Sequence, residues 1–388
     1  MNLLRHHDWS LPVPIAYGPG RVAQMAEFCR AAGMRKPLLV TDKGSEALPI
    51  IDRVLDALDQ GGLEKGLFAE ISPNPRDDEI AAGCQAFHQG GHDGIIAMGG
   101  GSGMDGGKAI SLLANNDIDL WAFNYDVPSP DMSGERAFPP LICIPTTAGT
   151  GAETESTAMI TDTTCMMKWC VWHPLHKPRL ALLDPELTIG LPRKLTAWTG
   201  CDAMIHAIEA YCVPDYHPIC DGIALEALAL TARWLPQAWA EPENLEARGG
   251  MLLGSCLGGI SFLKGLGLTH AISHMVGAEF STHHGLTNAV ALPAVLQFNR
   301  PAMEHRVPAM ARAMGLPEES FEAFYRAICE LLDTLEVPRT LSEIGVPEGC
   351  AAQIAEKAML DAAAGTNPRP VTVEDIEAVT RTALQVGR

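Results

Sequence analysis

Residues 36–151 alternate short apolar runs with stretches of helical periodicity, and the apolar runs end in glycine or a polar residue. The apolar runs predict strands, and the stretches between them predict helices. Strands that alternate with helices favour a parallel sheet with helices on both faces. A ligand of such a sheet lies beyond the carboxyl ends of its strands. Three polar tips fall there: Asp42, residues 99–102 and residues 146–151.

The pattern changes after residue 187, where strand-like runs almost disappear and helical periodicity continues to the end. A chain of 388 residues is also long for a single hydrophobic core. We therefore expect an α/β domain over residues 1–187 and an all-α helical domain over residues 188–388. The first domain should contain strands at 36–42, 65–71, 93–102 and 140–151, and helices at 21–32, 50–60, 80–89 and 105–114.

The composition excludes several classes of partner. A net charge of −19 would repel the phosphates of nucleic acids and of anionic membrane surfaces. The longest weakly polar stretch, residues 249–263, is glycine-rich and shorter than the ~18–20 apolar residues of a membrane helix, so it predicts a buried helix. The 11 cysteines form no CxxC pair, and the first residues lack an apolar signal core, which favours a cytoplasmic protein with reduced thiols.

Two glycine-rich loops follow predicted strands. The first, GGGSGMDGGK (99–108), leads into a helix, whose N-terminus favours a phosphate. The second, PTTAGTG (145–151), offers hydroxyl and N–H groups to a phosphate or a ribose. Neither is the GxGxxG fingerprint, and a tight strand–helix turn is the alternative interpretation of each loop. Two such loops at neighbouring strand tips favour a nucleotide.

Asp42 ends the predicted strand at 36–42. A carboxylate there can accept both hydroxyl groups of an adenosine ribose and would repel a 2′-phosphate, so it favours NAD over NADP. The cap of a following helix is a second role that Asp42 could have at the same time.

Asp202 and His206 lie four residues apart in an apolar helical stretch, so both occupy one helix face. His270 and His274 repeat this spacing, and a further histidine pair, 283–284, precedes a glycine. One carboxylate with several imidazoles suits Fe²⁺ or Zn²⁺. The alternative is that these are hydrogen-bonded histidines of a helical core.

Four motifs resemble those of the iron-containing (group III) alcohol dehydrogenase family. They occur in the family's order and span nearly the whole chain: GGGSGMDGGK, PTTAGTGAE, DPELTIGLPRKLTAWTGCDAMIHAIEAY and GLGLTHAISHMVGAEFSTHHG. The resemblance implies a Rossmann-like dinucleotide-binding domain followed by a helical metal-binding domain, which is the dehydroquinate synthase-like architecture. It also implies hydride transfer between NAD(H) and a short-chain primary alcohol or hydroxy acid, with Fe²⁺ as the metal and Zn²⁺ as the alternative. The implied partner beyond the substrate is a second copy of the chain, in a homodimer.

The resemblance assigns roles to individual residues. The implied metal ligands are Asp202, His206, His270 and His284, the last chosen over His283 because the family's ligand directly precedes a glycine. The implied cofactor-binding residues are Asp42, Asn74, Gly100, Gly101, Ser102, Asp105, Thr146, Thr147, Thr150 and Lys168. Lys108 matches the same motif, and a cation on a helix surface is its alternative role.

Two departures from the family pattern concern the cofactor. Glu155 stands where the family often has threonine, and a carboxylate beside the cofactor would be unusual. The sequence TDTTCMMKWC around Lys168 also departs from the family.

Three further residues invite hypotheses. His274 lies one turn after His270, and we expect it to relay the alcohol proton, with a core or second-layer histidine as the alternative. Glu209 could orient a ligand imidazole, although pairing with a cation is the interpretation we favour. The stretches WHPLHKPRLALLDPEL and FLKGLGLTHAISH look similar to the 4-hydroxybutyrate dehydrogenase-like branch, where Lys264 could bind a substrate carboxylate or remain a surface lysine.

Three rival functions share parts of this pattern. A metal-free, maleylacetate-type reductase would lack some of the four ligands, which this chain keeps. A lyase of the dehydroquinate synthase type would also use NAD and a metal, but PTTAGTG and THAISH favour the alcohol dehydrogenases. A sensor of NAD or metal is the non-enzymatic alternative, which turnover would exclude.

Overall fold

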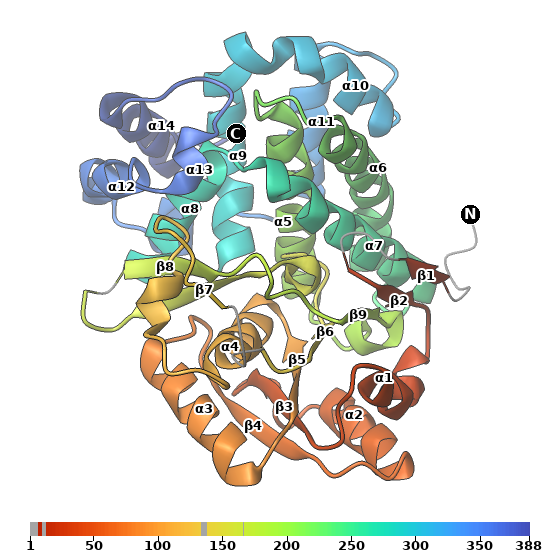
Figure 1. The fold of residues 1–388 in the computed structure, drawn as a ribbon. Coiled ribbons are helices and arrows are strands. Elements are labelled where there is room, and N and C mark those ends of the chain that lie inside the picture. The colour runs from red at the N-terminus through yellow and green to blue at the C-terminus, as the bar shows by residue number, and fades with distance from the viewer. Residues whose placement is uncertain (1–6, 10–12, 133–137, 166) are drawn as a thin grey trace. The chain divides into compact units, whose positions relative to one another are not determined.

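The computed structural model describes residues 7–9, 13–132, 138–165 and 167–388, and Figure 1 shows their arrangement as a ribbon. The chain divides into two compact units. The first comprises residues 1–147 and 151–189, and the second comprises residues 148–150 and 190–388. The described strands all lie in the first unit, and the second is built from helices.

A seven-stranded sheet forms the centre of the first unit. Its order is β1 (His7–Trp9), β2 (Ile15–Tyr17), β9 (Leu180–Leu183), β6 (Leu141–Pro145), β5 (Gly94–Gly99), β3 (Pro37–Asp42) and β4 (Gly66–Ile71). The six strands from β2 to β4 are parallel, and β1 pairs antiparallel with β2 at the edge. The expected parallel sheet is confirmed, although β5 and β6 end at the first residues of the glycine-rich loops that we had included in the strands.

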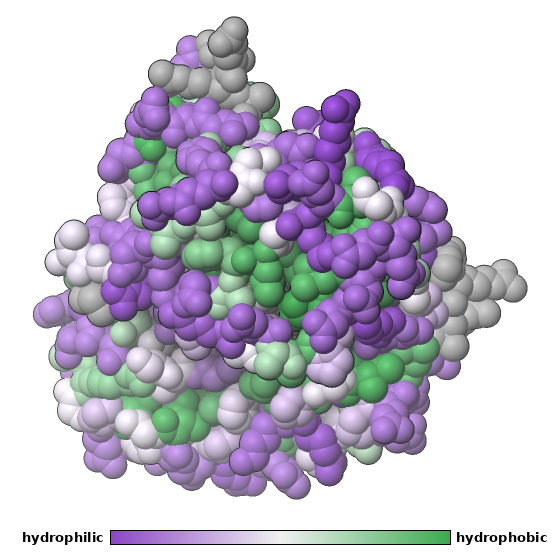
Figure 2. Space-filling model, turned by 90° about the horizontal axis from the view of Figure 1, so that it is seen from below, coloured by the Kyte–Doolittle hydropathy of each residue, from purple (hydrophilic) through white to green (hydrophobic). Residues whose placement is uncertain are grey.

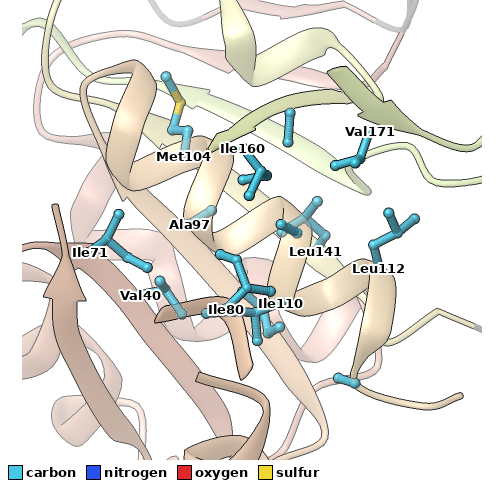
Figure 3. Close-up of a cluster of buried hydrophobic side chains, with 14 of the residues drawn as sticks. Val40, Ile71, Ile80, Ala97, Met104, Ile110, Leu112, Leu141, Ile160 and Val171 are labelled. Carbon is cyan, nitrogen blue, oxygen red and sulfur yellow. The ribbon is translucent and has the colours of Figure 1, made fainter. Parts of the chain in front are cut away.

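Helices cover both faces of this sheet because successive strand residues point to opposite sides. On one face, alternate strand residues such as Val40 and Ala97 pack with Ile80 and Ile110 of the helices α3 (Asp77–Gly90) and α4 (Gly101–Leu113), as Figure 3 shows. On the other face, the intervening residues, such as Leu39, pack against α1 (Met25–Ala31) and α2 (Pro49–Gln60). The glycine-rich loop is therefore anchored at the start of a helix that the core holds in place.

A separate antiparallel pair, β7 (Thr157–Asp162) with β8 (Met167–Trp172), was not among the predicted elements. Ile160 and Val171 of this pair join the core cluster that contains α4, with Ile160 on the side of Met104 and Val171 on the side of Leu112 (Figure 3). The register places Lys168 opposite Thr161. The pair thus carries one of the predicted cofactor residues on a hairpin packed over α4.

The second unit confirms the expected helical half. Its helices are α5 (Arg193–Cys212), α6 (Pro218–Ala240), α7 (Leu245–Ser261), α8 (Leu268–Phe280), α9 (His284–Met303), α10 (Val307–Ala313), α11 (Phe321–Thr334), α12 (Ala351–Ala358), α13 (Ala362–Gly365) and α14 (Val373–Gln385). α5 packs against α6, α7 and α9, and nearly all of its residues from Thr196 to Cys212 are buried. Polar side chains of α5 therefore lie inside this helical core.

Within the described residues, no single helix is long and apolar enough to cross a membrane. One bent pair of helical segments, Leu245–Lys264 with Leu268–Phe280, has the length and apolar composition of a membrane span only when the two are taken together across a 105° bend. Figure 2 shows a face of the molecule on which hydrophilic residues surround smaller apolar groups.

Candidate metal centre and cofactor loop

Four side chains of the second unit converge inside its helical core. Asp202 and His206 lie on α5, His270 lies on α8, and His284 is the first residue of α9. Asp202 Oδ1 lies 3.8, 3.6 and 3.5 Å from Nε2 of His206, His270 and His284, respectively. Ligand atoms about 2.1 Å from one tetrahedral metal ion lie roughly 3.4 Å apart. The four atoms thus have the chemistry of a divalent-metal site, their distances from Asp202 Oδ1 are close to this spacing, and all of them lie within 4.8 Å of one another.

Gly285 explains how α9 reaches this cluster. A Cβ atom at this position would lie 2.3 Å from the carbonyl oxygen of Trp198 and 3.1 Å from Cβ of Asp202. Only glycine allows the start of α9 to lie this close to α5. The neighbouring His283 has a different task, because its Nδ1 accepts the N–H of Leu286 at the helix start and its ring packs on Trp198.

Glu209 fixes the orientation of His270. Its Oε2 lies 2.6 Å from Nδ1 of His270, and its oxygens also accept the backbone N–H groups of Gly267 and Thr269 at the start of α8. A proton held on Nδ1 leaves the Nε2 lone pair for a metal. Glu209 thus makes the orienting contact that we had ranked second, with a predicted ligand imidazole on another helix. The same contact is an ion pair whenever His270 is protonated, so the cation pairing that we favoured is also present.

Burial and neighbouring charges set the protonation of the cluster. Burial would raise the pKa of Asp202, but the charges of His206 and His284 and a hydrogen bond to His270 bring it well below its usual value. Burial lowers the pKa of His206 to about 4. Burial also opposes the charge on His270, but hydrogen bonds to Asp202 and Glu209 raise its pKa to about 9. The cluster therefore presents an ionised carboxylate, and a proton must leave His270 before a metal can bind there.

His274 lies beside the cluster on α8. Its ring stacks on that of His284, with centroids 5.2 Å apart and planes 13° apart. Its Nδ1 lies 2.8 Å from Oδ2 of Asp361, whose Oδ1 accepts the N–H of Ala363 at the start of α13. Asp361 thereby holds the proton on Nδ1, and Nε2 is the nitrogen that can accept another.

The glycine-rich loop of the first unit, where we expect the cofactor, lies where the strand order reverses. β3 pairs with β4 on one side and with β5 on the other, and open α/β sheets bind ligands at such a point. Asp42 ends β3 there, and a Cβ atom at Gly99 would lie 3.1 Å from its Oδ2. Gly99 also has a φ of 143°, which favours glycine. The structure thus brings Asp42 and the start of the glycine-rich loop together.

Comparison with known proteins identifies the chain. The family description "Iron-containing alcohol dehydrogenase" matches residues 12–185, and "Fe-containing alcohol dehydrogenase family, C-terminal" matches residues 196–384. The chain belongs to the iron-containing alcohol dehydrogenase family.

Individual relatives of this iron-containing alcohol dehydrogenase cover nearly its whole length. The 4-hydroxybutyrate dehydrogenase of Cupriavidus necator is 36% identical over 92% of this chain and 94% of its own. The crystal structure of a 1,3-propanediol oxidoreductase has a TM-score of 0.89 and 34% identity, covering 95% of this chain and 97% of the other. Sulfoacetaldehyde reductase from Bifidobacterium kashiwanohense, in complex with NAD⁺, has a TM-score of 0.87 and 28% identity, covering 97% and 98%.

Most of the predicted cofactor residues of this dehydrogenase lie at the carboxyl ends of the strands. The Thr146 N–H donates to the Gly99 carbonyl at 2.9 Å, and a Cβ atom at Gly100 would touch Thr147. Further contacts there link Ser102 Oγ to the Pro73 carbonyl at 2.5 Å and Lys168 Nζ to Asn74 Oδ1 at 3.4 Å, while Gly101 begins α4. Thr150 belongs to the second unit, and its buried hydroxyl has no hydrogen-bond partner among the described residues.

Asp105 and Lys108 hold α4 in place. Lys108 Nζ lies 3.3 Å from Oδ1 of Asp105 and donates to the carbonyls of Ala152 and Thr157. Asp105 Oδ2 accepts the N–H of Met159. Lys108 is only 1% exposed, so it is not a helix-surface cation. Asp105 links Lys108 to β7 in this arrangement, and its contact with the cofactor stays a prediction.

Glu155, the residue that departs from the family pattern, is buried in the first unit. Burial raises the pKa of its carboxyl group to about 7, against the charges of Lys108 and Lys177. The Glu155 carboxyl group is then about half protonated at neutral pH, which reduces the negative charge that it adds after the loop at residues 145–151.

Lys264 is occupied by an internal ion pair. Its Nζ lies 2.6 Å from Oδ1 of Asp221, and Oδ2 of Asp221 also binds Arg306 at 2.9 Å. The Lys264 side chain is 1% exposed. It is therefore neither a surface lysine nor a free cation for a substrate carboxylate.

Sequence reasoning missed Asp361 and Asn288. The amide of Asn288, on α9, lies against three of the four predicted ligands, and Asp361 binds His274 from a position 87 residues away. No local spacing predicts Asp361. Asn288 carried a signal, because it follows His284 by four residues and so shares its helix face.

Proposed function

We propose that this chain transfers a hydride between NAD(H) and a short-chain primary alcohol or its aldehyde, using Fe²⁺ held by Asp202, His206, His270 and His284. The observation that carries this proposal is the convergence of one carboxylate oxygen and three Nε2 atoms within 4.8 Å of one another. A divalent metal bound there would supply Lewis acidity toward a substrate oxygen.

The chain's own residues prepare the metal centre for this chemistry. Glu209 keeps the Nε2 lone pair of His270 directed at the cluster, and Asp202 supplies the negative charge. His274 stacks beside His284 with Asp361 on its Nδ1, so its Nε2 is suited to accept the alcohol proton. Asp361 acts through His274 and is a positioning residue.

The cofactor that we propose is NAD. Asp42 at the strand-order reversal supports NAD over NADP, since a carboxylate there binds ribose hydroxyls and repels a 2′-phosphate. The sulfoacetaldehyde reductase that this chain resembles was solved with NAD⁺ bound. NAD supplies the hydride acceptor, and the task of Asp42 and the adjoining loops is to orient it.

The relatives act on a hydroxy acid, a diol and a sulfonated aldehyde, so their names do not select one substrate. The ion pair of Lys264 with Asp221 removes the residue that favoured a hydroxy acid, and we therefore place short uncharged alcohols first. Assembly of all four donors counts against the metal-free reductase. A cytoplasmic homodimer remains our expectation for the assembled protein.

The test is NADH formation by protein loaded with Fe²⁺ under anaerobic conditions. The panel compares short primary alcohols, diols and 4-hydroxybutyrate, with and without a chelator, and His206→Asn serves as the ligand-loss control. We expect turnover that the chelator abolishes and that His206→Asn lacks. Turnover that ignores the chelator, or no turnover with any alcohol, would overturn the proposal and favour the metal-free reductase or the lyase.

A further inference from the structure

Asn288 makes an unusual set of contacts inside the ligand cluster. Its Nδ2 lies 2.7 Å from Oδ1 of Asp202, 3.1 Å from Nε2 of His270 and 3.1 Å from Nε2 of His284. These are the atoms through which the three side chains would bind a metal. The side chain is fully buried, so its contacts are made without water.

The chemistry of this amide resembles that of the cation which the cluster would bind. An amide NH₂ group offers two protons and carries partial positive charge, so it can donate to Asp202 Oδ1 and to the Nε2 lone pair of His284 at once. Oδ1 of Asn288 is buried without a hydrogen-bond partner among the described residues. The amide oxygen thus stays without a hydrogen bond among the described residues, while the amide nitrogen contacts all three atoms that would bind the metal.

We propose that hydrogen bonds from the amide of Asn288 hold the ligand cluster together in the metal-free chain. A metal that binds there breaks one or more of these hydrogen bonds. The proposal rests on the proposed metal site and adds a step to its loading. An Nε2 lone pair that binds a cation cannot also accept a proton from Nδ2. Metal binding therefore costs the amide at least one hydrogen bond, and Asn288 lowers the metal affinity while stabilising the metal-free fold.

The effect of Asn288 on metal affinity is opposite to that of a residue that only positions a metal ligand. A side chain that only holds Asp202 in position raises metal affinity, and its loss typically weakens binding about 10–100-fold. A side chain that occupies the place of the metal competes with it, and its loss strengthens binding. Because the net value of one hydrogen bond is modest, we expect about a three- to tenfold gain in affinity.

The experiment compares Asn288→Leu and Asn288→Ala with the wild-type chain. Zn²⁺ affinity is measured by competition with a fluorescent chelator, and the melting temperature is measured with excess EDTA and with saturating Zn²⁺. We expect both variants to bind Zn²⁺ more tightly than wild type. With EDTA their melting temperatures should fall by about 2–4 °C, as expected for a loss of this size, and saturating Zn²⁺ should restore part of the difference.

Asn299→Leu is the matched control, because Asn299 is another buried asparagine of α9. Its amide pairs with Asn367 at 2.8 Å, away from the cluster. This variant should lose stability equally with EDTA and with Zn²⁺, at unchanged Zn²⁺ affinity. Weaker or unchanged Zn²⁺ binding by the Asn288 variants overturns the role of Asn288 alone, whereas a wild-type chain that binds no Zn²⁺ overturns the metal site as well.

Discussion

Asp361 Oδ2 lies 2.8 Å from Nδ1 of His274, although Asp361, the residue before α13, is 87 positions away from His274 on α8. The other oxygen of Asp361 caps α13 through the N–H of Ala363. The carboxylate therefore joins the start of one helix to the imidazole that we propose as the proton relay.

Asp361→Asn should lower kcat by about 10²–10⁴-fold, the usual value of one general base. The asparagine oxygen can keep the cap, but its NH₂ group then faces Nδ1 of His274, which moves the imidazole proton to Nε2. Steady-state NADH formation at matched metal content measures the loss. In a His274→Asn background the same substitution should add little, so two losses that multiply would contradict the link between the residues.

Glu209→Gln should weaken metal binding about 10–100-fold. Glu209 now accepts hydrogen bonds from His270 Nδ1 and from two backbone N–H groups at the start of α8. The NH₂ group of a glutamine must face one of these N–H groups, and that hydrogen bond is lost. Competition with a chelator measures the affinity. Glu226→Gln, on the exposed face of α6, is the control, and equal affinities in the two variants would show that Glu209 does not orient His270.

Gly285→Ala should reduce both metal affinity and stability, the latter by about 1–3 kcal/mol, as for other overpacked sites. The new methyl group would meet the Trp198 carbonyl and push α9, with His284, away from Asp202. Chemical denaturation and metal content report the two effects. Gly277→Ala is the control, since its Cβ would meet only the Thr282 carbonyl at 3.7 Å, and matching losses in both variants would contradict the packing argument.

His176 should make the first unit sensitive to acid. Burial lowers the pKa of its imidazole to about 3, whereas the unfolded chain takes up that proton near pH 6.5. Because the unfolded state binds the proton first, the free energy of unfolding should fall by about 1.4 kcal/mol per pH unit from this group between pH 6 and 3. His176→Gln can keep the contact with Ser111 Oγ and should fall less steeply, so parallel slopes in denaturation curves would refute the assignment.

Lys264→Met should leave the preference between 4-hydroxybutyrate and 1-butanol unchanged. The ammonium group is buried against Asp221, which keeps Arg306 as a partner after the substitution. The ratio of kcat/KM for the two substrates is the measurement. A selective loss of 4-hydroxybutyrate turnover would show that Lys264 binds the substrate carboxylate, contrary to our expectation.

The sequence predicted those parts of the molecule that depend on local spacing. Strand–helix alternation identified the parallel sheet, and the four-residue spacing placed Asp202 and His206 on one face of α5. The hairpin β7–β8 was missed because its two short strands lack a clear apolar alternation. Periodicity predicts the helix or strand to which a residue belongs, but it does not predict which residues of other elements will contact it.

Glu209 shows where this limit lies. It follows Asp202 and His206 at helical spacing, so the sequence placed it on their face, yet its partner His270 comes from another helix. The partner depends on how α8 approaches α5, which is a matter of tertiary packing. The same holds for Asp361, whose link to His274 spans 87 residues.

The proposed metal ligands on α5, α8 and α9 are not synthesised together. Asp202 and His206 leave the ribosome before His270, and His284 follows last. A growing chain therefore offers a metal only an incomplete set until the start of α9 has emerged. The ion that the enzyme acquires is then decided by the metals available around the finished chain, in competition with the tighter-binding Zn²⁺.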